Sequence, residues 1–209
     1  MNDNIKIAII DYGLGNLRSV YGSVEKLGYQ AYITNDIAKF EEADKLILAG
    51  VGAFKDGMES LNNLGLVEPL TKLVLDGQKP ILAICLGFQL LANESHEFGL
   101  HKGLGWIDAE VKKIDTKNSD LRVPHVGWND LFVTKDCILW KNIPEDSLFY
   151  YVHSFHVNCS SDDIVVGNCS YGIDFTAAVQ QGNIYGTQFH PEKSQYYGLE
   201  VLKNFIEKS

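Results

Sequence analysis

Hydrophobic residues in the first half of the chain form short apolar runs, and amphipathic stretches separate these runs. The apolar runs read as buried strands: Ile5–Ile10, Gln30–Thr34, Lys45–Ala49 and Ile81–Ile84. The amphipathic stretches read as helices: Asn16–Leu27, which Gly28 closes, Lys55–Leu64, and Pro69–Asp76, which Gly77 follows. Strands that alternate with helices predict a parallel, doubly wound sheet with its active groups at the carboxyl ends of the strands.

The second half has a different pattern, in which turn residues separate short β-rich runs. These runs are Leu104–Lys113, Val126–Thr134, Ser147–Val152, Ile164–Ser170 and Thr176–Gln180. We expect them to add antiparallel strands before Ile184–Phe189 rejoins the main sheet and Tyr197–Glu207 forms a closing helix. The predicted fold class is α/β, with a doubly wound, mostly parallel central sheet flanked by helices and an antiparallel β-rich addition. Without a repeat or linker, residues 1–209 are predicted to form a single domain.

One apolar strand ends in a cysteine and leads directly into a helix-forming run. Cys85 follows Ile81–Ile84, and the helix-forming residues run from Phe88 to Ala92. A strand, a nucleophile and a helix in this order form a nucleophile elbow, whose sharp turn requires small neighbours such as Ala83 and Gly87. The N–H groups that open the helix favour the thiolate and can hold an oxyanion. The alternative is a buried structural cysteine, which is a common role for this residue type.

A histidine and a glutamate at the end of a later strand supply the partners that a cysteine nucleophile needs. His190 ends this strand, and Glu192 follows with Pro191 between them. Side chains at i and i+2 of an extended segment point to the same side, and proline favours an extended residue before it. We therefore predict a catalytic triad in which His190 is the base for Cys85 and Glu192 orients the imidazole.

Two glycine loops follow neighbouring strands. The loop Ala49–Phe54 after the third strand can present an N–H to an anion, so beside the elbow we predict that it supplies a second oxyanion-hole donor, with the N–H of Leu86 as the first. The alternative is a structural turn. The loop Asp11–Asn16 has two glycines of a dinucleotide-binding fingerprint, but Arg18 occupies the position of the third. The incomplete fingerprint does not favour dinucleotide binding.

Composition excludes several other functions. The 209 residues are 45% hydrophobic and carry a net charge of −9 without a basic stripe, which argues for a globular protein that does not bind nucleic acid. No apolar run approaches the length of a membrane span, and the N-terminus lacks the basic region of a signal peptide, so we expect a cytoplasmic protein. The four cysteines lack C-x-x-C spacing and the histidines lack metal-ligand spacing, so we expect neither disulfides nor a metal site.

These motifs together resemble the class I (triad) glutamine amidotransferases and, more narrowly, the glutaminase subunits of imidazole glycerol phosphate synthases. The matching segments are residues 11–16, 50–54, 85–87, 103–107, 124–129, 152–154 and 188–194. The resemblance implies hydrolysis of L-glutamine to glutamate and ammonia through a γ-glutamyl thioester on Cys85, without a cofactor. It also implies a heterodimer with a (β/α)₈ barrel cyclase, which uses the ammonia to form imidazole glycerol phosphate in histidine biosynthesis, and gating of the oxyanion loop by that partner.

The resemblance assigns further roles outside the triad, and it places the oxyanion on the backbone of Leu86 and of the loop that contains Val51 and Gly52. The residues that it places on glutamine are Gly52, Gln89, Glu97, His153 and Ser154. The residues that it places near the cyclase interface are Asn16, Trp128, Tyr150 and Lys193. The alternatives are solvated helix positions for Gln89 and Glu97, a packed strand end for His153, and ordinary core aromatics for Trp128 and Tyr150.

The chain departs from the family's usual residues at positions that carry no catalytic atom. These positions are Ala49 (usually proline), Ala83 (glycine), Phe88 (methionine), Phe155 (tyrosine) and Asp108-Ala109 (Pro-Gly). They leave open a paralogous glutaminase that supplies ammonia to another synthase, such as one that amidates a surface sugar. From other classes, a cysteine peptidase fits less well because no peptide groove is legible, and a non-catalytic binding module is disfavoured by the intact triad.

Overall fold

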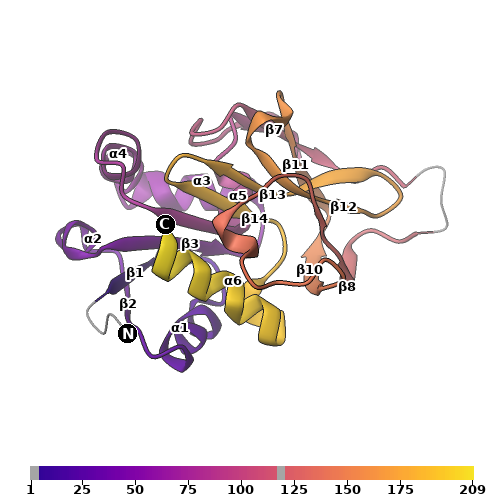
Figure 1. Ribbon diagram of the computed structural model, residues 1–209. Coiled ribbons are helices and arrows are strands. Elements are labelled where there is room, and N and C mark those ends of the chain that lie inside the picture. Colours follow the sequence, from indigo (N-terminus) through magenta and orange to yellow (C-terminus); the bar gives the residue numbers. More distant parts are fainter. Residues whose placement is uncertain (1–4, 117–120) are drawn as a thin grey trace.

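The computed structural model describes residues 5–116 and 121–209, which contain a twelve-stranded mixed sheet and a separate two-stranded sheet (Figure 1). The strands are β1 (Lys6–Ile10), β2 (Gln30–Thr34), β3 (Lys45–Gly50), β4 (Ile81–Cys85), β5 (Glu94–Ser95), β6 (His101–Lys102), β7 (Ala109–Lys113), β8 (His125–Asp130), β9 (Phe132–Val133), β10 (Leu148–His153), β11 (Phe155–Cys159), β12 (Val165–Ser170), β13 (Asp174–Gln181) and β14 (Ile184–Thr187). The α-helices are α1 (Leu17–Lys26), α2 (Ile37–Glu42), α3 (Phe54–Asn63), α4 (Val67–Thr71), α5 (Leu86–Leu90) and α6 (Gln195–Lys208). Short turns of other helix types are η1 (Lys72–Asp76), η2 (Ile138–Trp140), η3 (Asp162–Ile164) and η4 (Pro191–Lys193).

The large sheet has a parallel part and an antiparallel part. Its parallel strands lie in the order β2-β1-β3-β4-β14, so β14 joins the first-half strands as predicted. Beyond β14 the order continues β13-β11-β7-β5-β6, mostly antiparallel, with β12 on β13 and β9 on β12. Strands β8 and β10 pair with each other. The predicted α/β class with an antiparallel addition is confirmed.

Helices cover both faces of the parallel part. Successive residues of a strand point to opposite faces, so an apolar strand has two faces to bury. Ile7 and Ile9 of β1 belong to the same core cluster as residues of α1 and α6, whereas Ala8 and Ile10 pack with residues of α2 and α3. Figure 1 shows α1 and α6 on one side of this sheet and α3, α4 and α5 on the other. Both faces are buried, which explains the continuous apolar runs in the sequence.

Several predicted elements differ in extent from the observed ones. The stretch Leu104–Lys113 is strand only from Ala109, and the helix after Cys85 begins at Leu86 instead of Phe88. Helix α2 and strand β11 were not predicted. A signal for α2 was available, because the side chain of Asp36 accepts a hydrogen bond from the N–H of Ala38 and caps the helix.

Within the described residues, no helix combines the length and the apolarity that crossing a membrane requires.

Lys45 on β3 is a buried charged residue whose ammonium group is fully engaged in hydrogen bonds. Its ammonium donates hydrogen bonds to the carbonyl oxygens of Phe205 and Ser209, at 3.0 and 2.6 Å. These contacts tie the end of α6 to the centre of the sheet, and burial lowers the pKa of Lys45 to about 8.

Gly87 allows α5 to lie directly on β3. A β-carbon on Gly87 would collide with the carbonyl oxygen of Leu48, a backbone atom that cannot turn away. We therefore predict that Gly87→Ala lowers the free energy of unfolding by about 1–3 kcal/mol, as overpacking of a core does. Chemical denaturation measures the change.

The matched control is Gly22→Ala on the exposed side of α1, where an added β-carbon meets nothing within 4 Å. This variant should gain about 0.5–1 kcal/mol, because alanine is the better helix former. A Gly87→Ala protein as stable as the wild type would contradict the close contact between α5 and β3.

Candidate active site

Cys85 occupies a strained backbone position between β4 and α5. Its φ of 54° and ψ of −107° lie in a region that residues with a side chain rarely adopt. The thiol belongs to a residue that is only 6% exposed, and its Sγ lies 3.9 Å from the carbonyl oxygen of Val152. Strand pairing places Gly50 of β3 beside Cys85. This is the local geometry of the predicted nucleophile elbow.

His190 and Glu192 form a buried ion pair a few residues after β14. The Nδ1 atom of His190 lies 2.8 Å from Oε1 of Glu192, and both side chains are nearly inaccessible. The predicted contact therefore exists, but the predicted extended path is wrong beyond His190, because Pro191–Lys193 forms the 3₁₀ turn η4. A carboxylate at Nδ1 keeps the proton on that nitrogen and leaves Nε2 as the basic atom.

The environment of His190 favours its charged form. Burial on its own lowers the pKa of His190, but the facing Cys85 and Glu192 outweigh burial and raise it from 6.5 to about 10. These two neighbours stabilise the imidazolium form of His190. The Nε2 atom has no hydrogen bond of good geometry among the described residues. This nitrogen is thus available for proton transfer.

Gln188 is a contact of the thiol that the sequence analysis did not identify. Its Nε2 atom lies 3.7 Å from Sγ of Cys85, and its Oε1 accepts a hydrogen bond from Nε2 of Gln89 at 3.1 Å. The Gln89 amide also donates to the carbonyl oxygen of Phe155 at 2.8 Å. The sequence signal available was a polar residue near the end of an apolar strand, two positions before His190; the structure shows that Gln188 is fully buried.

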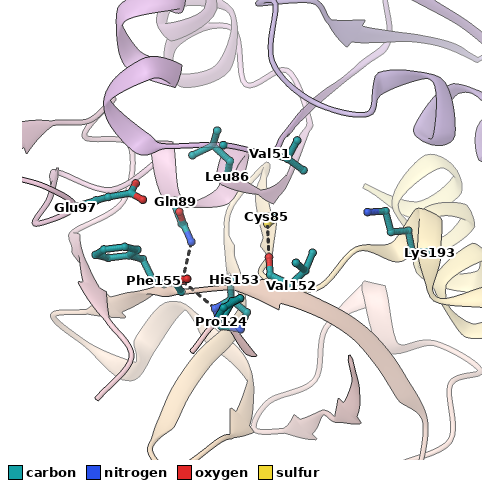
Figure 2. A pocket seen from close by; sticks show the side chains of 12 residues that line it. Val51, Cys85, Leu86, Gln89, Glu97, Pro124, Val152, His153, Phe155 and Lys193 are labelled. Carbon is teal, nitrogen blue, oxygen red and sulfur yellow. Dashed lines mark hydrogen bonds between the residues drawn. The ribbon is translucent and has the colours of Figure 1, made fainter. Parts of the chain in front are cut away.

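The predicted oxyanion and substrate-binding residues line one pocket together with Cys85 (Figure 2). The pocket has a volume of about 370 Å³, and its lining includes Val51, Gly52, Leu86, Gln89, Glu97, His153 and Ser154. His190 and Glu192 are buried and do not line it. Figure 2 shows Glu97 and Lys193 at opposite sides of the thiol.

The loop at the pocket has N–H groups that are not used in the backbone hydrogen bonds of the described residues. Gly52 has a φ of 120°, which glycine adopts readily. Within the described residues, the N–H groups of Val51 and Gly52 make no backbone hydrogen bond. One side of the pocket is fixed by Glu97, whose Oε2 accepts a hydrogen bond from the N–H of Phe54 at 2.6 Å.

Two neutral histidines connect the pocket wall to β8. His153 contacts the carbonyl oxygen of Phe155 through Nδ1 at 2.9 Å and Nδ1 of His125 through Nε2 at 3.0 Å. The amide of Asn129 lies 3.3 Å from the remaining nitrogen of His125. Burial lowers the pKa of His125 to about 4 and that of His153 to about 3. In each ring Nδ1 therefore donates a hydrogen bond and Nε2 accepts one: His153 donates to the Phe155 carbonyl oxygen, His125 donates to His153, and Asn129 donates to His125.

Three of the four predicted interface residues lie together beside the pocket. Trp128 and Tyr150 face each other across β8 and β10 with ring centroids 6.0 Å apart, and the Lys193 ammonium lies 5.8 Å from the Tyr150 ring. Trp128 is 44% exposed, so it is not an ordinary core aromatic. Asn16 lies at the start of α1, in a separate surface depression.

One group of potential metal ligands occurs within the described residues, formed by Glu94, His96 and Glu110. Its members are partly exposed and already engaged, because Glu110 contacts Lys112 at 2.6 Å and His96 at 3.2 Å. Because Lys112 and His96 already pair with the two carboxylate oxygens of Glu110, we assign no metal to this group.

A family model described as "Glutamine amidotransferase class-I" matches residues 8–209. The chain belongs to this family. Curated relatives are similar over nearly their whole length, and their names identify them as subunits of imidazole glycerol phosphate synthase. Subunit HisH of Sulfurimonas denitrificans is 48% identical over 203 residues, covering 96% of this chain and 97% of that protein. Subunit HisH 2 of Nitrobacter winogradskyi is 45% identical over 207 residues, covering 97% and 98%.

Solved structures share the fold at low sequence identity. One titled "Crystal structure of glutamine amidotransferase" has a TM-score of 0.74 at 19% identity and covers 96% of this chain and 97% of that one. The structure of PurLQS from Thermotoga maritima has a TM-score of 0.72 at 20% identity, with 96% and 97% covered. The amidotransferase fold therefore extends through nearly the whole chain.

The buried neutral histidines make the stability of this amidotransferase sensitive to acid. Below pH 6.5 an unfolded chain binds protons at His125 and His153 that the folded chain rejects, because their folded pKa values are about 4 and about 3. The free energy of unfolding should therefore fall with decreasing pH, by up to about 1.4 kcal/mol per pH unit for each histidine. Urea unfolding between pH 7 and pH 4.5 measures this slope.

The control for this pH dependence is His125→Asn, which keeps an amide donor near the Nδ1 position and cannot be protonated. We expect a shallower slope for this variant than for the wild type. Equal slopes would show that His125 is not held neutral in the folded protein.

Proposed function

We propose that this chain is the glutaminase subunit of an imidazole glycerol phosphate synthase, acting in the cytoplasm in histidine biosynthesis. The observation that carries the proposal is 45–48% identity to HisH subunits over nearly the full length. The geometry supports it, because a strained cysteine, a buried His–Glu pair and a pocket with free backbone N–H groups lie together. We take residues 1–209 to form a single glutaminase domain that uses no cofactor.

The reaction has an acylation half and a hydrolysis half, and in each half His190 accepts a proton and then returns it. His190 takes the proton of Cys85, and the thiolate attacks the side-chain amide carbon of L-glutamine. The tetrahedral oxyanion is held by the N–H groups of Leu86 and of the loop that contains Val51 and Gly52. His190 then gives its proton to the departing ammonia, which leaves a γ-glutamyl thioester. Water activated by His190 hydrolyses the thioester to glutamate and restores the thiol.

Substrate specificity follows from the polar groups around the pocket. Gln89, Glu97, His153 and Ser154 line it, and we assign them to glutamine binding. Gln89 already donates hydrogen bonds to Phe155 and Gln188, so its contribution is to hold the pocket wall as well as to contact the substrate. Glu97 carries the negative charge that suits the α-ammonium group of an amino acid.

Ammonia that escaped into water would become ammonium and lose its nucleophilicity, so the glutaminase needs a docked acceptor. We propose a (β/α)₈ barrel cyclase that binds over Trp128, Tyr150 and Lys193, with Asn16 at the margin. The exposed ring of Trp128 and the nearby side chain of Leu148, which is 45% exposed, give this surface apolar area. Docking beside the pocket places the partner where it can influence the oxyanion loop.

A second candidate is a paralogous glutaminase that supplies ammonia to a different synthase. The names of several relatives carry a number, such as HisH 2 of Nitrobacter winogradskyi and HisH 1 of Campylobacter jejuni. Such numbering indicates more than one related protein in an organism. The triad fixes the ammonia donor and leaves the acceptor open, so co-purification with the cyclase and glutamine-driven formation of imidazole glycerol phosphate distinguish the candidates.

The nucleophile is tested by Cys85→Ala. In this variant the rate of glutamine hydrolysis should fall by at least about 1,000-fold, measured as glutamate release in the presence of the cyclase. Mass spectrometry of the wild type quenched during turnover should show a glutamyl adduct on Cys85. The buried Cys169→Ala, in a strand of the antiparallel part, is the matched control and should keep its activity. Retained activity in Cys85→Ala would favour a non-catalytic module instead.

The docking surface is tested by Trp128→Ala. Large exposed aromatics dominate many interfaces, so this change should weaken the affinity for the cyclase by at least about 10-fold in a calorimetric titration. Leu64→Ala, at the end of α3 and equally exposed at 44%, should bind like the wild type. Wild-type affinity in Trp128→Ala would place the interface elsewhere.

A further inference from the structure

Tyr12 carries a buried hydroxyl that takes no part in the triad reaction. The residue follows β1 in the loop of residues 11–16 and is fully buried. Within the described residues, its hydroxyl has no hydrogen-bond partner. Burial and, to a smaller extent, a charge on Cys85 raise the pKa of Tyr12 above its ordinary value of 10. The phenol therefore keeps its proton at neutral pH and remains a donor.

The hydroxyl lies against the backbone of the oxyanion loop, which we define as Gly50–Gly52. A β-carbon on Gly50 would collide with the Tyr12 hydroxyl and would lie 3.3 Å from the β-carbon of Leu86. Gly50 also pairs in register with Cys85. The unused donor is therefore placed between the loop and the elbow, where it faces main-chain atoms of Gly50.

The tyrosine is fixed on its own side, whereas the loop has open space beside it at Gly52. The carbonyl oxygen of Tyr12 accepts a hydrogen bond from the hydroxyl of Ser60 on α3. The preceding Asp11 donates from its N–H to the carbonyl oxygen of Thr34 at 2.8 Å. By contrast, a β-carbon on Gly52 would meet nothing within 4 Å. Any rearrangement between the two therefore occurs in the glycine loop.

The observed loop conformation leaves the N–H groups of Val51 and Gly52 available to an oxyanion, and, within the described residues, it leaves the Tyr12 hydroxyl without a hydrogen-bond acceptor. The N–H groups of Val51 and Gly52 make no backbone hydrogen bond among the described residues, so they are free for an oxyanion. A buried donor without a partner destabilises this arrangement. Rotation of a peptide plane in the loop can turn a carbonyl oxygen toward Tyr12 and the N–H away from the pocket. The hydroxyl thus gains its partner when the oxyanion hole is dismantled.

We propose that Tyr12 is a positioning residue that biases the oxyanion loop toward a second, less active arrangement, which a docked partner reverses. The inference deepens the proposed glutaminase function and rests on it. It assigns part of the low activity expected of the isolated glutaminase to one hydroxyl group. Tyr12 touches neither substrate nor reacting atoms and acts only through the loop.

The test is Tyr12→Phe, which removes the hydroxyl and keeps the ring. In the isolated glutaminase, kcat for glutamine hydrolysis should rise about 10-fold with little change in KM. In the complex with the cyclase, kcat should match the wild type, so the stimulation by the partner falls about 10-fold. The melting temperature should not decrease, because the removed group is unsatisfied in this structure. Tyr12→Met, which also lacks the hydroxyl, repeats the measurement if the phenylalanine variant folds poorly.

The matched control is Tyr185→Phe on β14, where a buried hydroxyl accepts a hydrogen bond from Gln180 at 3.4 Å. This variant should keep the wild-type ratio of stimulated to basal rates. An unchanged ratio in Tyr12→Phe overturns the proposal, and so does an equal fall of both rates, which would mean that the hydroxyl supports the active arrangement. Failure of the proposed function is distinguishable, because the wild-type complex would then not hydrolyse glutamine.

Discussion

The active site depends on holding Cys85 in a backbone conformation that an isolated chain would avoid. Two neighbouring strands and one helix enforce it: β3 pairs with β4 up to Cys85, and α5 lies so close to β3 that only glycine fits at position 87. Strain of this kind persists only where the surrounding structure determines it completely. This conformation places the thiol at the edge of the sheet, beside the first N–H groups of α5.

The other catalytic groups reach the same edge because β14 is parallel to β4. Ile184 pairs with Ile81 and Thr187 with Ile84, so the residues after β14 emerge next to the elbow. Gln188 then contacts the thiol, and His190 and Glu192 follow within a short turn. The long excursion of the chain through the antiparallel part therefore ends beside β4, where a base can reach Cys85. The parallel pairing is therefore the link between the fold and the chemistry.

The sequence was informative wherever a local pattern and the global fold agree. The apolar runs of β1, β3 and β4 are continuous because both of their faces are buried, and the turn chemistry at Cys85 and Gly87 is unusual enough to indicate an elbow. Helix α2 was missed because its single buried position, Phe40, gives almost no periodicity. Glu192 was placed correctly by an incorrect route, since spacing alone does not distinguish an extended segment from a 3₁₀ turn. Gln188 was missed because its role depends on a contact with a residue 103 positions away.

The pattern of polar groups without partners connects stability to function in this molecule. In the described part of the chain, the buried atoms without partners include the Tyr12 hydroxyl, Nε2 of His190 and Oε2 of Glu192. Folding alone would eliminate such groups, because each costs free energy when it is shielded from water. Nε2 of His101 and the hydroxyl of Tyr151 are in the same position, so the set is not confined to the catalytic groups. Tyr12 and His190 differ from these two in their electrostatic coupling to Cys85, where a proton in transit, a substrate or a rearranged loop can supply a partner. For His190 the missing partner is supplied by the reaction itself. For Tyr12 no reaction step supplies one, and the glycine-containing backbone beside it is the remaining source, which is the basis of the positioning role proposed above.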